Sequence, residues 1–180
     1  MIVRFTSLQL LLAVAVLALG MRGASAQSFL DQDAEAALQS LYSTSPAAKA
    51  LSETAKGILM FPVITKAGFL VGGQGGEGVL FEKGKPVAHY SAGGATIGIQ
   101  AGVQSYAYAL FLMTDADLAY LNRSGGWSLG VGPNIVVVDA GAAKDVSTLT
   151  AQKGVHAFIF EQKGLMAGVG LVGQKISRIR

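Results

Sequence analysis

Cysteine is absent from all 180 residues, which excludes disulfide bonds, a thiol nucleophile, thiolate metal ligands and an acylated lipoprotein cysteine. Histidine is almost absent too. His89 and His156 are the two that occur, and neither has a partner two to four residues further on. Because metal ligands usually cluster at such spacings, the sequence predicts no metal site and no other cofactor. The fold must be held together by its core alone.

The first 26 residues are predicted to be a secretory signal peptide. Arg4 supplies a basic start, Leu10–Leu19 is an unbroken apolar run, and Ala24-Ser25-Ala26 is a small-x-small cleavage sequence. The run is too short for a bilayer-spanning helix, which needs about 20 residues. We therefore expect an exported, periplasmic protein whose mature chain begins at Gln27 and forms one domain over residues 27–180.

Charged residues are scarce, at 14% of the chain. Once the two arginines of the signal peptide are removed, 12 Lys+Arg remain against 11 Asp+Glu, so no broad basic surface is expected. This balance disfavours nucleic-acid binding. The basic residues are nevertheless concentrated near the end of the chain, in Lys144–Arg180.

Glycine is abundant, and five glycines fall within the seven residues before Val79. Gly73, Gly75 and Gly78 match G-x-G-x-x-G, the pattern that holds a dinucleotide pyrophosphate. That pattern requires a helix after the glycines. Here a short apolar stretch and a turn ending at Pro86 follow instead, so the glycines are interpreted as a place where backbone passes close to backbone.

The start of the mature chain has the apolar spacing of two amphipathic helices. The first covers Asp31–Ser43; the second is opened by the N-cap pair Ser45-Pro46 and stops at Gly57. Thr114–Asp117 resembles a capping box and predicts a third, short helix.

The remaining chain is rich in predicted strands. Apolar residues alternate with small or polar ones along Ala95–Val103, which indicates a strand with one apolar face. The alternation breaks at Gln104-Ser105. Almost every residue of the following Tyr106–Met113 is apolar, which is typical of a strand buried on both faces. Further strands are predicted at Trp127–Val131 and Ile135–Val138.

The last segment predicts a hairpin formed by Val155–Phe160 and Leu165–Val172 across Glu161–Gly164. The fold class expected is α+β, with N-terminal helices packed on a strongly curved, mainly antiparallel sheet. Two arrangements fit the sequence, an open curved sheet and a sheet closed into a small barrel.

Four long blocks resemble the SYLF domain, a lipid- and actin-binding module known from yeast actin-patch proteins. In chain order they are AKGILMFPVITKAGFLVGGQGGEGVL, GIQAGVQSYAYALFLMTDADLAYL, SLGVGPNIVVVDAGA and AFIFEQKGLMAGVGLVGQKISRI. The resemblance spans Leu38 to Ile179 and is closest to the exported, single-domain bacterial branch. It implies a non-enzymatic module that binds membrane lipid, phosphoinositides in eukaryotic members, through an N-terminal amphipathic helix and basic residues.

This chain departs from that pattern in its first helix. Asp31–Ser43 carries three acidic residues and no basic one, so an anionic membrane should repel it. Lipid contacts are therefore predicted elsewhere, at six basic residues and one aromatic residue that could anchor at an interface. These predicted lipid-binding residues are Lys56, Lys66, Lys163, Lys175, Arg178, Arg180 and Trp127.

The leading hypothesis is a non-enzymatic module that binds anionic phospholipid or a phosphoinositide-like headgroup at a membrane surface in the bacterial envelope. The alternative is a structural or assembly protein that binds other envelope proteins or itself. A third hypothesis, a hydrolase, requires His89 or His156 to lie beside Glu77 or a serine in an open pocket.

Overall fold

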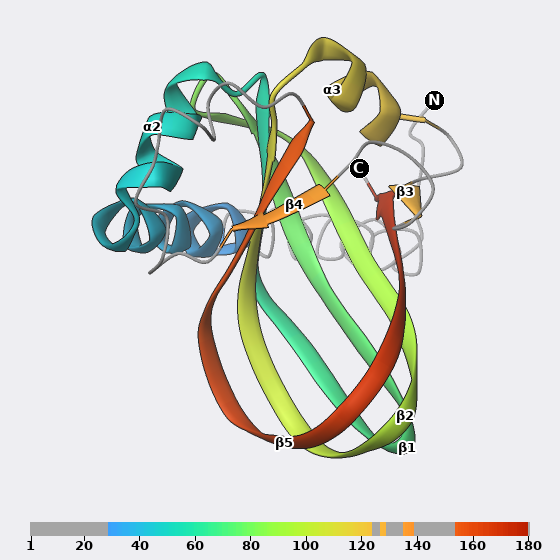
Figure 1. The fold of residues 1–180 in the computed structure, drawn as a ribbon. Helices are drawn as coiled ribbons and strands as arrows, with labels where there is room; N and C mark the ends of the chain where they lie inside the picture. The colour runs from blue at the N-terminus through green and yellow to red at the C-terminus, as the bar shows by residue number, and fades with distance from the viewer. Residues whose placement is uncertain (1–28, 124–126, 129–134, 139–153, 180) are drawn as a thin grey trace, which may run out of the picture.

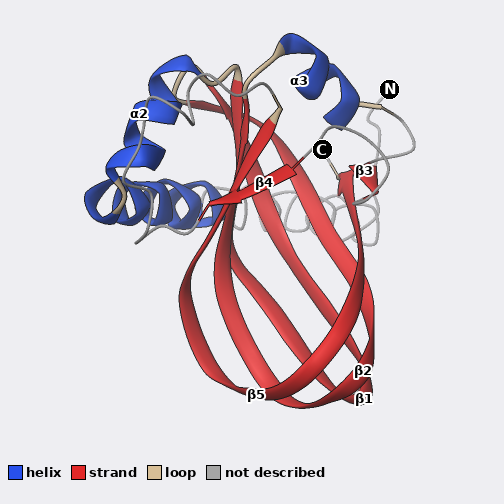
Figure 2. Ribbon diagram, in the orientation of Figure 1, coloured by secondary structure: helices blue, strands red, loops and turns tan. Residues whose placement is uncertain are grey.

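The computed structural model describes residues 29–123, 127–128, 135–138 and 154–179. The predicted signal peptide and Arg180 lie outside these residues. The described part of the chain forms three helices and a five-stranded sheet (Figures 1 and 2).

The three predicted helices are present, and the first extends one to two residues beyond its predicted ends. The first covers residues 29–44, α2 is Pro46–Thr54 and α3 is Asp115–Leu121. The Ser45 hydroxyl caps α2 by accepting a hydrogen bond from the Ala48 amide, and Thr114 and Asp117 form a complete capping box at α3. Among the described helices, none is long and apolar enough to cross a membrane.

Three very long strands dominate the sheet. The strands are β1 (Gly57–Glu82), β2 (Lys85–Leu112), β3 (Trp127–Ser128), β4 (Ile135–Val138) and β5 (Val155–Arg178). Their order is β1-β2-β5-β3, all antiparallel, while β4 pairs in parallel with β5. In the described pairings β1 has only β2 as a neighbour, so the sheet stays open. The predicted α+β class with a mainly antiparallel sheet is confirmed.

The predicted C-terminal hairpin is wrong, because residues 155–178 form one continuous strand. β2 pairs with β5 on both sides of the expected turn, from Leu112–Val155 to Tyr90–Arg178. Glu161 (φ 52°) and Gly164 (φ 94°) bend the strand without reversing it. The phase break predicted at Gln104-Ser105 is also a bulge within one strand, since the β2–β5 register shifts between Ser105 and Ala107.

Each long strand is folded over near its middle, so that both ends lie beside the helices (Figure 1). In β1 the chain turns between Gly68 and Gly72, where a Cβ on Gly68 would lie 2.5 Å from the Gly72 Cα. The returning half packs directly on the first half. A Cβ on Gly76 would meet the Val63 carbonyl oxygen at 2.3 Å, and one on Gly78 would meet the Phe61 ring at 2.5 Å. The glycine-rich segment therefore serves close backbone packing, as the sequence analysis interpreted it.

Two hydrophobic clusters stabilise the end of the sheet near the helices. One joins Leu41 and Leu51 of the helices to Phe111 and Phe158 of the sheet. The other lies on the opposite face and includes Leu110. Alternate residues of the segment predicted to be buried on both faces contribute to the two clusters, which confirms that prediction.

Candidate functional site

The long strands bend at the end of the sheet farthest from the helices (Figures 1 and 2). Four apolar side chains near this bend are exposed. Phe69 is 75% exposed, Val71 65%, Val103 59% and Leu70 54%. We call these four residues the apolar tip. Phe69 pairs with Ala101 and Val103 with Ala67, so the tip spans two neighbouring strands. Several large apolar side chains exposed together are uncommon in a monomer and mark an interaction surface.

Leu70 adds backbone strain to this exposure. Its φ is 60°, in the left-handed region, and the β1–β2 register shifts between Phe69 and Val71 around it. A branched apolar residue in that region costs about 1–2 kcal/mol relative to the ordinary conformations, whereas glycine or asparagine adopts it readily. Such strain is most often retained at functional positions.

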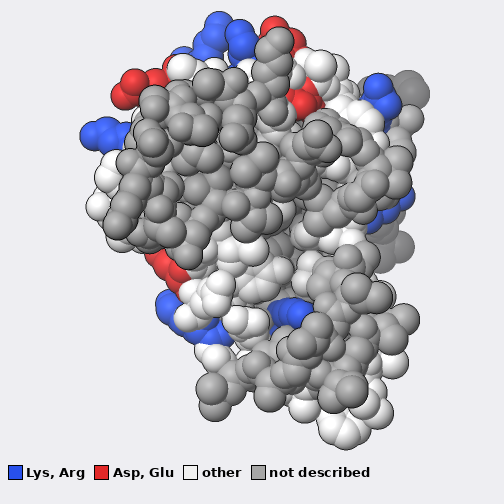
Figure 3. Space-filling view, in the orientation of Figure 1, with Lys and Arg blue, Asp and Glu red and all other residues white. Residues whose placement is uncertain are grey.

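Two of the predicted lipid-binding lysines stand just behind the tip. Lys66 pairs with Gln104 on β2, and Lys163 pairs with the next residue, Ser105. They therefore lie on either side of β2 at nearly the same height. In Figure 3 the lower end of the molecule shows uncharged atoms among those described, with basic side chains above it.

The structure does not bring the other basic residues to this position. Lys56 precedes β1 beside the helices, Lys175 pairs with Gly93, and Arg178 pairs with Tyr90 near the end of β5. Burial raises the pKa of Tyr90, and the charge of Arg178 partly opposes that rise. Arg180 lies outside the described residues.

Trp127 is placed differently from the prediction. It is 1% exposed and belongs to the second hydrophobic cluster, with its ring edge-on to Tyr120 at a centroid distance of 6.0 Å. The ring is therefore a core residue and cannot anchor at a membrane interface, so its assignment to lipid binding is wrong.

A polar cavity of about 310 Å³ opens between the folded halves of the sheet, directly behind Lys66. Its lining residues are Lys66, Gln74, Gln104, Tyr106, Tyr108, Ile159, Gln162 and Gln174. The Tyr106 hydroxyl donates a hydrogen bond to the side-chain Oε1 of Gln74 across the cavity, at 3.3 Å. Burial raises the pKa of both tyrosines, so their hydroxyls stay protonated and able to donate.

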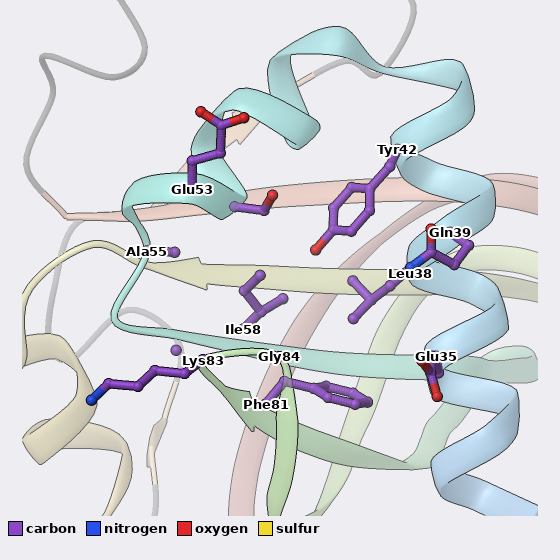
Figure 4. A pocket seen from close by; sticks show the side chains of 12 residues that line it. Glu35, Leu38, Gln39, Tyr42, Glu53, Ala55, Ile58, Phe81, Lys83 and Gly84 are labelled. Atoms are coloured by element: carbon purple, nitrogen blue, oxygen red, sulfur yellow. The ribbon is translucent and has the colours of Figure 1, made fainter.

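A second cavity, of about 270 Å³, lies between the helices and β1 (Figure 4). Leu38, Tyr42 and Ile58 point into it, while Glu53 points away from its centre. Glu35 and Glu53 both belong to its lining and are opposed by Lys83 alone. This cavity is apolar inside with an acidic rim, so it does not suit an anionic headgroup.

In the described residues, the contacts of the two histidines differ from those that the hydrolase hypothesis requires. The His89 Nε2 lies 2.8 Å from the Asp31 Oδ1 and ties the first helix to β2. The Ser91 hydroxyl donates to the Ser177 carbonyl oxygen at 3.5 Å, not to His89. His156 is fully buried in the sheet. Neither histidine lines the two cavities described above, and no cluster of three metal-ligating residues occurs in the described ranges.

Sequence reasoning missed the apolar tip and the glutamines of the polar cavity. The signal for the tip was present, since Phe69-Leu70-Val71 leads directly into the glycine-rich bend. Apolar residues beside a bend remain exposed when no helix or second sheet packs over the bend. Gln74 stands alone among glycines, and this isolation was the available signal for the cavity.

The described residues thus combine an open, folded β-sheet with an apolar tip, two flanking lysines and a polar cavity. Residues 93–179 match the family model described as Ysc84, Las17-binding protein actin regulator. This stretch holds β2 from Gly93 onward and all later described elements. The match confirms the resemblance to the SYLF domain seen in the sequence, and the Ysc84 (SYLF) family is one of lipid- and actin-binding modules. No curated protein matches the chain.

Proposed function

We propose that this protein is a non-enzymatic lipid-binding module that docks on an anionic membrane surface in the bacterial envelope after export to the periplasm. The apolar tip enters the interface between headgroups and acyl chains. Lys66 and Lys163 then stand at the level of the phosphates. The match of residues 93–179 to a family of lipid- and actin-binding modules supports the proposal.

The observation that carries the proposal is the strained, exposed Leu70 between two exposed apolar neighbours. Fully burying a Val, Leu or Phe side chain gains about 1.5–3 kcal/mol, and at 54–75% exposure most of that gain is still available. Three such residues provide about 4 kcal/mol, and two lysines near an anionic surface add about 2 kcal/mol. These values support reversible binding rather than permanent anchoring.

The test is cosedimentation of the Gln27–Arg180 chain with vesicles of phosphatidylglycerol and phosphatidylcholine. This chain retains every described element and omits Leu10–Leu19, an apolar run that would itself bind vesicles. We expect binding that increases with the phosphatidylglycerol content and weakens with salt. No binding at low salt would refute the proposal.

Charge substitutions sharpen this test. Lys163→Gln should weaken binding to anionic vesicles about fivefold, because a basic residue near such a surface contributes about 1 kcal/mol. Lys49→Gln is the matched control, since Lys49 is exposed on α2 at the other end of the molecule. Equal losses in the two variants would show that net charge, not the tip, directs binding.

The alternative, a structural or assembly protein, rests on the same apolar tip meeting a second copy or another envelope protein. β1 is a sheet edge in the described pairings, which adds unpaired backbone groups for such a contact. Light scattering separates the two functions. A concentration-dependent oligomer that no longer binds vesicles favours assembly, and a monomer that binds them favours the membrane.

A further inference from the structure

The polar cavity behind the apolar tip has the composition of an anion-binding site. Seven of its eight lining residues carry a hydrogen-bond donor, namely the Lys66 ammonium, the glutamine amides and the tyrosine hydroxyls. None of the eight described residues that line it is acidic. Lys66 makes no ion pair within the described part of the chain, so its charge is available to a ligand.

Gln174 provides independent evidence that the cavity is built for a ligand. It is 7% exposed, and its amide nitrogen has no hydrogen-bond partner among the described residues. A buried donor left without a partner destabilises a fold, and folded proteins rarely retain one. The unpaired amide belongs to a residue that lines the cavity, so a bound acceptor oxygen would satisfy it.

The sheet register explains how the glutamines come together. Gln74 pairs with Gly94, and Gly94 pairs with Gln174, so the two glutamines flank a residue without a side chain. Neighbouring strands are spaced by about 4.8 Å, so the backbones of the two glutamines lie about 10 Å apart with β2 between them. Because Gly94 has no side chain, the space between the two glutamine side chains above it is left for a small group. Tyr106 holds the Gln74 carbonyl oxygen from the opposite wall, which leaves the Gln74 amide hydrogens to face a ligand.

We propose that this cavity binds the phosphate of a lipid headgroup, with Lys66 and Gln174 as its principal donors. The inference rests on the proposed membrane function and specifies its ligand class. Lys66 links the two features, because it lines the cavity and also stands three residues before Phe69 of the tip. A lipid whose acyl chains surround the tip would thereby present its phosphate to the cavity.

The experiment separates the headgroup from the acyl chains. Glycerophosphoglycerol, which is phosphatidylglycerol without its acyl chains, is titrated into the Gln27–Arg180 chain by calorimetry, with inorganic phosphate in a parallel arm. We expect the headgroup to bind, and Gln174→Leu and Lys66→Gln each to weaken it about tenfold, because a hydrogen bond to a charged group has that magnitude. Gln32→Leu, at an exposed position of the first helix, is the matched control.

Stability measurements distinguish a binding role for Gln174 from a structural one. Gln174→Leu removes the unpaired donor and should leave the melting temperature unchanged or raised while it weakens binding. A lower melting temperature with unchanged headgroup binding would overturn the proposal. If Gln174→Leu does not fold, the proposal is tested by headgroup binding of Lys66→Gln alone, because Lys66 is only half-buried and tolerates replacement. Unchanged headgroup binding by that variant would then overturn the proposal.

The outcomes also separate this inference from the proposed function. Loss of vesicle binding on substitution of Leu70, together with headgroup binding that Gln174→Leu does not change, refutes the cavity and leaves the membrane function standing. Headgroup binding that depends on Gln174, with no vesicle binding at all, refutes the membrane function and the lipid source. Inorganic phosphate binding as tightly as the headgroup also overturns the lipid source.

Discussion

Leu70→Asn tests the function of the apolar tip without confusing binding with folding. Leu70 has a φ of 60° and is 54% exposed. Asparagine tolerates the left-handed conformation far better than leucine does. The substitution therefore removes apolar surface from the tip and relieves backbone strain in the same step.

The substitution should weaken vesicle binding and at the same time stabilise the fold. Leucine gains about 1.5–3 kcal/mol on full burial, and roughly half of its surface is still available, so vesicle binding should weaken by about 1.2 kcal/mol, or roughly eightfold. Relief of strain should raise the free energy of unfolding by up to about 1 kcal/mol. For a domain of this size that corresponds to a rise in melting temperature of about 3 °C.

The assay pairs cosedimentation on phosphatidylglycerol vesicles with differential scanning calorimetry of the same protein. Val87→Asn is the control, since Val87 is 47% exposed but lies beside the β1–β2 turn. Vesicle binding of Leu70→Asn equal to that of the unchanged chain would refute a role for the tip. A fall in its melting temperature would refute the argument from strain.

Two further predictions concern the core and the bend. Gly78→Ala places a Cβ 2.5 Å from the Phe61 ring and should destabilise the fold by about 2–3 kcal/mol. The Cβ of Gly93→Ala meets no atom within 4 Å, so this control should be neutral or slightly stabilising. Urea unfolding midpoints compare the two variants, and equal midpoints would contradict the close packing of β1 on itself. The fluorescence of the buried Trp127 should not change when vesicles are added, while Leu70→Trp should add a blue-shifted component. A shift in the emission of Trp127 itself would show that this residue contacts the membrane interface.

Local chemistry made part of this fold predictable. The caps at Ser45 and Thr114 depend on residues within three positions of each other, so the sequence alone identifies them. The nearly continuous run of apolar residues before Met113 likewise indicates that both faces of this strand are buried. In each case the sequence spacing and the spatial contact coincide.

The errors arise where contacts are distant in sequence. Glu161–Gly164 has the composition of a turn, but β2 pairs with both of its flanks and keeps β5 continuous. Trp127 has the chemistry of an interfacial anchor, yet residues remote in sequence bury it. Lys66 and Lys163 were predicted together with four other cations, and only the sheet register shows that these two lie at nearly the same height along β2.

The features assigned to function share one physical property, which is that each opposes folding. Leu70 is strained and exposed, Phe69 is exposed, and Gln174 keeps a buried donor unpaired. None of them belongs to the two hydrophobic clusters that stabilise the sheet beside the helices. A sequence shaped by stability alone would favour asparagine or glycine at position 70 and an apolar residue at position 174. Lys66 connects the two departures, because it lines the cavity together with Gln174 and stands three residues before Phe69 of the tip, and this connection is the reason to assign them to one ligand.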